Sequence, residues 1–244
     1  MIRLEPGARL RRTTPDDLDA IVAIKRSLPM PRAEQTSTGG FLLGSEVEAY
    51  RTLLAVARGW LLEVDGLAAG FALTLDDAIL RQSPVWQRRA TIAWDPAFDV
   101  AAATSRRLGY FDQLAVLPTV RRRYWGAALA LRALAELFDE AGHELVLTTT
   151  VVEPVCNRAA LPHLARVGAR QRGRVEERYP DAGRVVSAVH VIERDDYRRH
   201  FAALAAGPPA TRRIVALVDR ALVDGALVDG ALVEGALVDA GAPG

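Results

Sequence analysis

The sequence predicts an α/β domain with a mixed β-sheet, and three observations lead to this prediction. Short apolar runs of the strand type alternate with longer amphipathic segments of the helix type. Two pairs of these runs are joined by hairpin-type turns, at Asp65-Gly66 and at Asp181-Ala182-Gly183. Half of the 244 residues are hydrophobic and a quarter are charged, so the chain is able to bury a sizeable core.

The first part of the chain predicts three strands and two helices. We expect the strands at residues 8–14, 59–64 and 67–75, and the helices at residues 14–28 and 45–57. Thr14 and Ser45 are suitable N-caps, and Pro15 suits the first helical position because its missing N–H has no helical partner there. Residues 76–108 carry Trp86, Trp94 and several prolines, and are predicted as a long excursion without assigned elements.

The second part predicts a further strand–helix alternation that ends in a hairpin. We expect strands at residues 109–117, 143–152, 172–180 and 184–193, and helices at residues 125–141 and 157–168. Gly142 suits the end of the longer helix. Asn157 is a suitable cap for the shorter one, while Pro162 inside it removes a hydrogen bond and is expected to bend or delay the helix.

The last part of the chain repeats the pentapeptide ALVDG with small variations from Ala216 to Ala240. A period of five does not match the helical period, and the recurring glycines weaken a helix further. We therefore expect a main domain over residues 1–206 and a low-complexity tail over residues 207–244, disordered or loosely helical. The repeat is explained either by expansion of a short DNA repeat or by a partner-binding amphipathic segment.

Charge and cysteine content exclude several classes of function. The net charge is only +1, which argues against a nucleic-acid binder. Basic residues are almost all arginine, and Lys25 is the single lysine. Cys156 is the single cysteine, so no intrachain disulfide or multi-cysteine zinc site is expected. No apolar run approaches the roughly 20 residues of a membrane span, and the expected location is the cytoplasm.

The junction between the strand at residues 109–117 and the helix that follows it predicts an anion site. It reads VLPTVRRRYWGAALA over residues 116–130. The first N–H groups of a helix have no helical partners and form a positive pole, which binds phosphate well. Arg121, Arg122 and Arg123 add positive charge, and Gly126 and Ala127 leave room for a bulky anion. The alternative is a solvated basic turn before an ordinary helix.

Two motifs in this half of the chain resemble those of the GNAT-type N-acetyltransferases. The first resembles the acetyl-CoA motif and is read through Val116, Pro118, Arg121, Gly126, Ala128 and Leu129. The second resembles the pattern of the following helix and is read through Asn157, Ala160 and Gly168. The order of the predicted elements also fits that family, and the resemblance covers roughly residues 8–193.

The resemblance implies a fold, a reaction and a co-substrate. The fold is a twisted, mostly antiparallel mixed sheet of about six to seven strands flanked by about four helices. The reaction is direct transfer of the acetyl group of acetyl-CoA to a primary amine, on a small molecule or a protein, without a metal. The implied partners are acetyl-CoA and the amine, with no nucleic acid or membrane, and the protein is expected to be a monomer or homodimer.

The resemblance also assigns residues to the co-substrate. The central strand of the family separates from its neighbour, and pantetheine lies in the gap, which here implies backbone contacts from Leu114, Ala115 and Val116. The pyrophosphate is implied to lie against the turn and helix start, which comprise Arg121, Arg122, Arg123, Tyr124, Trp125, Gly126 and Ala127. Asn157 is implied to contact the cofactor near its sulfur end. Tyr124 departs from the pattern, which has glycine at this position.

Proton transfer in this family implies a base and an acid. Some members carry an acid at the position of Asp112, which makes it the candidate base; the alternative is a structural carboxylate bonded to backbone or to an arginine. Members often use a tyrosine as the acid where this chain has Leu164. Tyr110 on the strand is the candidate for that role here, and His163 is a second one.

The acceptor pocket is expected between residues 31–44 and the excursion at residues 76–108. Trp86, Trp94 and Phe98 fit an apolar or aromatic-amine pocket, or serve only to anchor the excursion. The acids Glu34, Asp76 and Asp77 are candidates for attracting a cationic amine. An alternative to the enzyme is a non-catalytic acyl-CoA-binding or interaction module that kept the fold.

Overall fold

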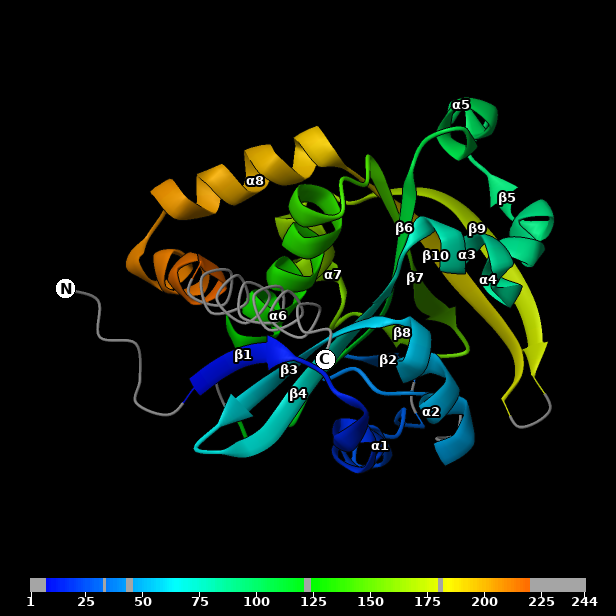
Figure 1. Cartoon of the computed structure of the whole chain (residues 1–244). Coiled ribbons are helices and arrows are strands. Elements are labelled where there is room, and N and C mark those ends of the chain that lie inside the picture. Colours follow the sequence, from blue (N-terminus) through cyan, green and yellow to red (C-terminus); the bar gives the residue numbers. More distant parts are fainter. Residues whose placement is uncertain (1–7, 33, 43–45, 121–123, 180–181, 220–244) are drawn as a thin grey trace, which may run out of the picture.

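The computed structural model describes residues 8–32, 34–42, 46–120, 124–179 and 182–219. In this part of the chain eight strands form one twisted sheet in the order β1-β3-β4-β6-β7-β10-β9-β5 (Figure 1). The strands of this sheet are β1 (Ala8–Arg12), β3 (Arg58–Val64), β4 (Leu67–Leu75), β5 (Ala93–Trp94), β6 (Leu108–Val116), β7 (Leu145–Glu153), β9 (Arg170–Tyr179) and β10 (Gly183–Glu193). A separate two-stranded piece pairs β2 (Gln35–Thr36) with β8 (Cys156–Asn157).

The pairing confirms the predicted mixed, mostly antiparallel sheet. Every neighbouring pair in it is antiparallel except β6 and β7, which run parallel. The sheet is larger than the six to seven strands expected because the excursion contributes β5, which pairs with the edge strand β9. The hairpin between β3 and β4 forms as predicted, since Asp65 (φ 52°) and Gly66 (φ 78°) adopt the positive dihedrals of a tight turn.

Helices cover both faces of the sheet, and side-chain alternation along the strands explains how. On β3, Trp60 and Leu62 pack into the cluster around α6, whereas Leu61 between them packs against α1 and α2. The α-helices are α1 (Leu18–Arg26), α2 (Val47–Val56), α3 (Asp77–Gln82), α4 (Pro84–Gln87), α5 (Val100–Thr104), α6 (Tyr124–Ala135), α7 (Leu161–Arg166) and α8 (Arg194–Ala206). Single turns of other helix types are η1 (Pro15–Asp17), η2 (Arg88–Thr91) and η3 (Glu136–Glu140).

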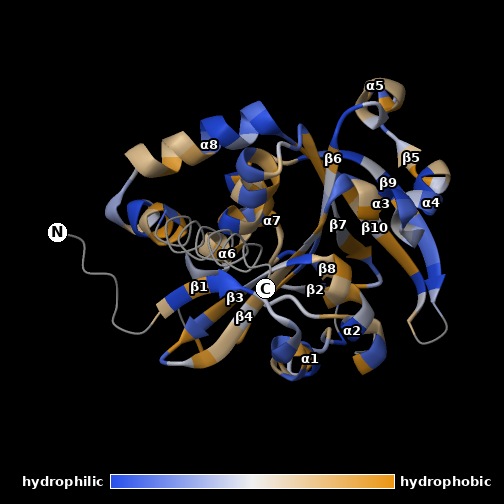
Figure 2. Cartoon of the chain, viewed as in Figure 1, coloured by the Kyte–Doolittle hydropathy of each residue, from blue (hydrophilic) through white to orange (hydrophobic). Residues whose placement is uncertain are grey.

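The helix α6 is buried on all sides. Every residue from Trp125 to Ala135 is buried, because the sheet covers one side and C-terminal segments cover the other. These segments are α8 and a helix at residues 209–219, which lies beside α6 in Figure 1. Figure 2 shows the hydrophilic start of α8 in blue and the hydrophobic strand β10 in orange. Over the described residues no helix is long and apolar enough to cross a membrane.

The helix at residues 209–219 bears on the predicted domain division. Its side chains Ile214, Leu217 and Val218 are at most 4% exposed and belong to the same cluster as α6. Leu217 and Val218 come from the first unit of the pentapeptide repeat. The hydrophobic core therefore continues past the boundary expected at residue 206, and residues 220–244 lie outside the described part.

A buried carboxylate ties α6 to the first strands. Glu136, on the π-helical turn η3 that follows α6, is fully buried and accepts hydrogen bonds from Trp60 Nε1 and from Arg12 and Arg58. The Arg132 guanidinium lies 3.9 Å from the centre of the Trp60 ring. Because a buried carboxylate is tolerated only with such partners, this cluster fixes the end of α6 against β1 and β3.

Two local expectations were wrong. Asn157 does not cap α7, because it lies in β8 and Ala160 occupies the N-cap position. Pro162 removes no helical hydrogen bond, since its place in the first turn of α7 tolerates proline, but the expected delay is confirmed because the helix begins only at Leu161. Ser45, the expected cap of α2, lies outside the described residues.

The packing of the C-terminal helix gives a stability prediction. Replacing Leu217 by alanine should lower the free energy of unfolding by about 2–5 kcal/mol, because it leaves a cavity beside α6. Arg212→Ala on the exposed side of the same helix is the control and should change stability little. Urea unfolding followed by circular dichroism measures both. Equal, small effects of the two substitutions would show that this helix does not pack on the core.

Candidate functional site

The central feature of the site is a gap between β6 and β7. The two strands pair in parallel only from Leu108 to Phe111 and from Leu145 to Thr148. Beyond these residues β6 continues to Val116 paired with β4, and β7 continues to Glu153 paired with β10. One side of residues 112–116 therefore faces a gap into which an extended ligand fits as an added strand.

A β-bulge at Asp112 explains where the gap begins. On β4, Leu73 pairs with Gln113 and the next residue, Thr74, pairs with Phe111, so that Asp112 has no residue opposite it. A bulge bends its strand and increases the local twist. It stands directly after Phe111, where pairing with β7 stops. The same bulge brings two consecutive side chains, those of Asp112 and Gln113, within hydrogen-bond distance of each other.

The Asp112 carboxylate is held by a chain of side chains that reaches to α2. Its Oδ2 accepts a hydrogen bond from Gln113 Nε2 at 3.1 Å, and Gln113 Oε1 accepts one from the Tyr50 hydroxyl at 2.5 Å. Burial raises the pKa of Asp112, and the hydrogen bond from Gln113 and the positive charge of Lys25 offset this only in part. Neither an arginine nor a backbone group is among these partners.

Lys25 supplies a cation near this carboxylate. It lies on α1, is 7% exposed, and its Nζ stands 5.1 Å from the Phe41 ring centre and 4.7 Å from that of Tyr50. Burial lowers the pKa of Lys25, and the charge of Asp112 opposes this shift. Sequence reasoning singled out Lys25 only as the one lysine of an arginine-rich chain, and it missed Tyr50 and Gln113 as well.

Tyr110 lies at the closed end of the gap. Its hydroxyl forms a 3.0 Å hydrogen bond with Thr149 Oγ1 on β7, just past the last paired residue. Its side chain is buried, and burial together with the nearby charge of Asp112 raises the pKa of the phenol. The structure thus brings both candidate catalytic residues to the place where β6 and β7 separate.

The predicted cofactor residues follow the gap and the start of α6. Leu114, Ala115 and Val116 lie on the part of β6 that β7 does not pair with. Tyr124, Trp125, Gly126 and Ala127 form the first turn of α6, and the Tyr124 ring packs on Trp125 at 4.7 Å between ring centres. Arg121, Arg122 and Arg123 lie outside the described residues.

Two polar atoms on the segments that follow β7 are buried without a hydrogen-bond partner among the described residues. They are Asn157 Oδ1 on β8 and His163 Nδ1 on α7. The His163 ring lies against the start of α6, because a Cβ added at Gly126 would be 3.1 Å from its Cε1. Burial lowers the pKa of His163. Buried polar groups without partners are uncommon, so these two atoms are candidates for hydrogen bonds to a ligand.

Asp76 and Asp77 are the two acids of the excursion that were expected to attract an amine, and both have other partners. Asp76 accepts a hydrogen bond from Arg58 Nε at 2.6 Å, at the base of the excursion. Asp77 binds Arg81 at 2.9 Å and accepts a hydrogen bond from the backbone N–H of Leu108 at 2.9 Å. Both carboxylates therefore hold the excursion in place, and that expectation was wrong for them.

Comparison by sequence finds neither a matching family model nor a matching curated protein. Comparison by structure finds N-acetyltransferases. The ribosomal-protein-S18-alanine N-acetyltransferase of Escherichia coli is 14% identical with a TM-score of 0.51, over 76% of this chain and 93% of that chain. Arabidopsis thaliana NAA60 in complex with acetyl-CoA is 16% identical with a TM-score of 0.53, over 76% and 99%.

Mutant forms of the spermidine/spermine N-acetyltransferase SpeG from Vibrio cholerae are 12% identical with a TM-score of 0.53, over 80% of this chain and 98% of that chain. These likenesses show that the chain has the fold of the N-acetyltransferases to which it was compared.

Proposed function

We propose that the protein transfers the acetyl group of acetyl-CoA to the primary amine of an acceptor. The observation that carries this proposal is the gap between β6 and β7, which begins at Asp112 and Tyr110. A strand-like ligand in the gap would have its reactive end beside a carboxylate of raised pKa and a protonated phenol. That pairing suits a reaction that removes a proton from one reactant and gives a proton to the other.

The residues along the gap fit the donor. The backbone of Leu114, Ala115 and Val116 would pair with the amide groups of pantetheine, and an N–H there would polarise the thioester carbonyl. The start of α6, with Arg121 to Arg123 before it, would hold the pyrophosphate. Asn157 would bind the arm between them through its unpartnered Oδ1. Among the similar structures, NAA60 was solved with acetyl-CoA.

Two side chains would move the protons. An amine arrives as an ammonium ion, and Asp112 accepts the proton that must leave before nitrogen can attack. The neutral amine then forms a C–N bond with the acetyl carbon as the C–S bond breaks. Tyr110 donates its proton to the departing thiolate, and the second proton that nitrogen loses restores the phenol through water. The proton held by Asp112 passes to solvent. Holding both reactants in line supplies much of the acceleration.

The donor site gives a binding prediction. In calorimetric titration, acetyl-CoA and CoA should bind the full chain at about one to one. Asn157→Leu should weaken binding roughly tenfold, because it removes the unpartnered amide. Gln171→Leu, an exposed change of the same type on β9, is the control and should bind as tightly as wild type. Failure of the unaltered protein to bind either ligand at millimolar concentration would exclude this function.

The proposed base gives a pH prediction. Asp112→Asn should lower kcat/KM roughly a hundredfold or more in a thiol-release assay with a panel of amines. The unaltered enzyme should gain activity as the pH rises through the pKa of Asp112, which burial raises, and the variant should lack this acidic limb. Glu63→Gln, on β3, is a control that should keep the wild-type profile. An unchanged profile in Asp112→Asn would exclude Asp112 as the base.

Asp112→Asn also gives a stability prediction, which distinguishes a catalytic role of this carboxylate from a structural one. The folded-state pKa of Asp112 is raised, so the folded protein binds more protons and its stability falls as pH rises through that pKa. Asp112→Asn should therefore raise Tm at neutral pH, and the gain should vanish below both the folded and the unfolded pKa. A structural carboxylate would instead lower Tm when replaced, and thermal unfolding at several pH values distinguishes the two.

A further inference from the structure

The excursion between β4 and β6 covers one face of the sheet. It leaves β4 at Leu75, forms α3, α4, η2, β5 and α5, and returns at Leu108. Its strand β5 pairs with β9, although β6, β7 and β10 lie between β4 and β9 in the sheet (Figure 1). The excursion therefore spans the sheet at the level where β6 and β7 are still paired.

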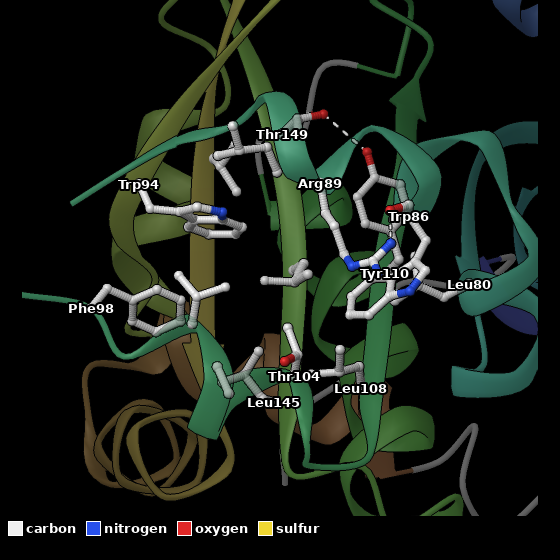
Figure 3. A pocket seen from close by; sticks show the side chains of 15 residues that line it. Leu80, Trp86, Arg89, Trp94, Phe98, Thr104, Leu108, Tyr110, Leu145 and Thr149 are labelled. Atoms are coloured by element: carbon white, nitrogen blue, oxygen red, sulfur yellow. Dashed lines mark hydrogen bonds between the residues drawn. The ribbon is translucent and has the colours of Figure 1, made fainter. Parts of the chain in front are cut away.

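An apolar pocket lies between the excursion and the sheet. Figure 3 shows Trp94 and Phe98 on one side of it, Trp86 and Tyr110 on the other, with side chains of the sheet between them. The empty space between these side chains is about 510 Å³, and this figure includes open solvent. The Trp94 and Phe98 ring centres are 5.4 Å apart, so these two rings form one continuous wall.

The pocket meets the gap at one pair of side chains. The Tyr110 ring forms part of the pocket wall, and its hydroxyl points toward Thr149 at one end, where the parallel pairing of β6 and β7 stops (Figure 3). Asp112 follows two residues later on the same strand. The pocket therefore ends two residues along β6 from Asp112, which is not itself one of its lining residues.

The lining of the pocket indicates which group fits. Aromatic rings from four residues offer faces and edges to another ring, and none of the described residues that line the pocket is acidic. The one charged lining residue is Arg89, whose guanidinium stacks 4.7 Å from the centre of the Trp86 ring. A second ammonium group on the acceptor would therefore meet the positive charge of Arg89 without a carboxylate among the described lining residues to pair with.

We propose that the pocket binds the aromatic group of the acceptor, so that the acceptor is a primary amine joined by a short chain to a phenyl or indole ring. This inference rests on the proposed acetyl transfer and adds the substrate class. It disfavours polyamines, which carry a second positive charge. The pocket is made by the excursion, so the same excursion decides the choice of acceptor.

The test compares amines and two matched variants of α5. Ala103 is buried and lines the pocket, whereas its neighbour Ala102 is exposed. Ala103→Phe should fill the pocket, and Ala102→Phe adds the same ring outside it. With acetyl-CoA, the full chain should acetylate 2-phenylethylamine or tryptamine with a kcat/KM at least about tenfold above that for ethylamine or spermidine. Ala103→Phe should remove this preference by raising the KM for the aromatic amines, and Ala102→Phe should keep the preference.

A binding measurement separates this inference from the proposed function. Calorimetry in the presence of CoA should show that 2-phenylethylamine binds the full chain more tightly than ethylamine, and Ala103→Phe should abolish the difference. Binding without turnover of any amine would overturn the proposed reaction and leave the pocket assignment standing. Turnover without preference for the ring would overturn the pocket assignment and leave acyl transfer standing. An effect of Ala103→Phe seen only with hexanoyl-CoA as donor would have the same meaning, because the pocket would then hold the acyl chain and not the ring of the acceptor.

Discussion

The site depends on the place where the parallel pairing of β6 with β7 stops. Up to Phe111 and Thr148 the two strands form an ordinary ladder, and beyond them each is held only by its other neighbour. The bulge at Asp112 in the β4–β6 ladder stands at this point. The end of the pairing with β7 leaves backbone groups of β6 open toward the gap, and the bulge places the Asp112 carboxylate at the end of that gap. In the proposed function, binding and proton transfer share this one local feature of the backbone.

A carboxylate at this point is costly, and its surroundings compensate for the cost only in part. Gln113 and Lys25 favour the charged form of Asp112, while burial disfavours it more strongly. Tyr50 orients Gln113 and also packs against the Lys25 ammonium. Residues that work in catalysis commonly lower stability in this way, whereas structural carboxylates are usually well paired. Glu136 of the same molecule is such a well-paired carboxylate, because it accepts hydrogen bonds from Trp60, Arg12 and Arg58. Asp112 lacks comparable compensation.

Two additions to the central sheet shape what surrounds the gap. The C-terminal helix at residues 209–219 and α8 cover α6, so the helix that begins beside the gap is fixed from both sides. The excursion covers the other face and closes a pocket of aromatic rings over the paired part of β6 and β7. The first addition packs against the helix beside the gap, and in our proposal the second selects the acceptor.

The sequence by itself determined the elements whose signals are local. The hairpin at Asp65-Gly66 follows from the positive dihedrals that these residues tolerate, and the strand that carries Tyr110 and Asp112 and the helix that begins near Gly126 follow from apolar pattern and motif spacing. Only the tertiary structure decided what surrounds them. Tyr50 reaches Gln113 across 63 positions of the chain, β5 pairs with β9, and Leu217 in a repeat that predicts a loose tail is buried against α6. Turn dihedrals and side-chain period act over a few residues, whereas burial and charge at a site are set by segments far apart in the chain, so a pattern read along the sequence does not contain them.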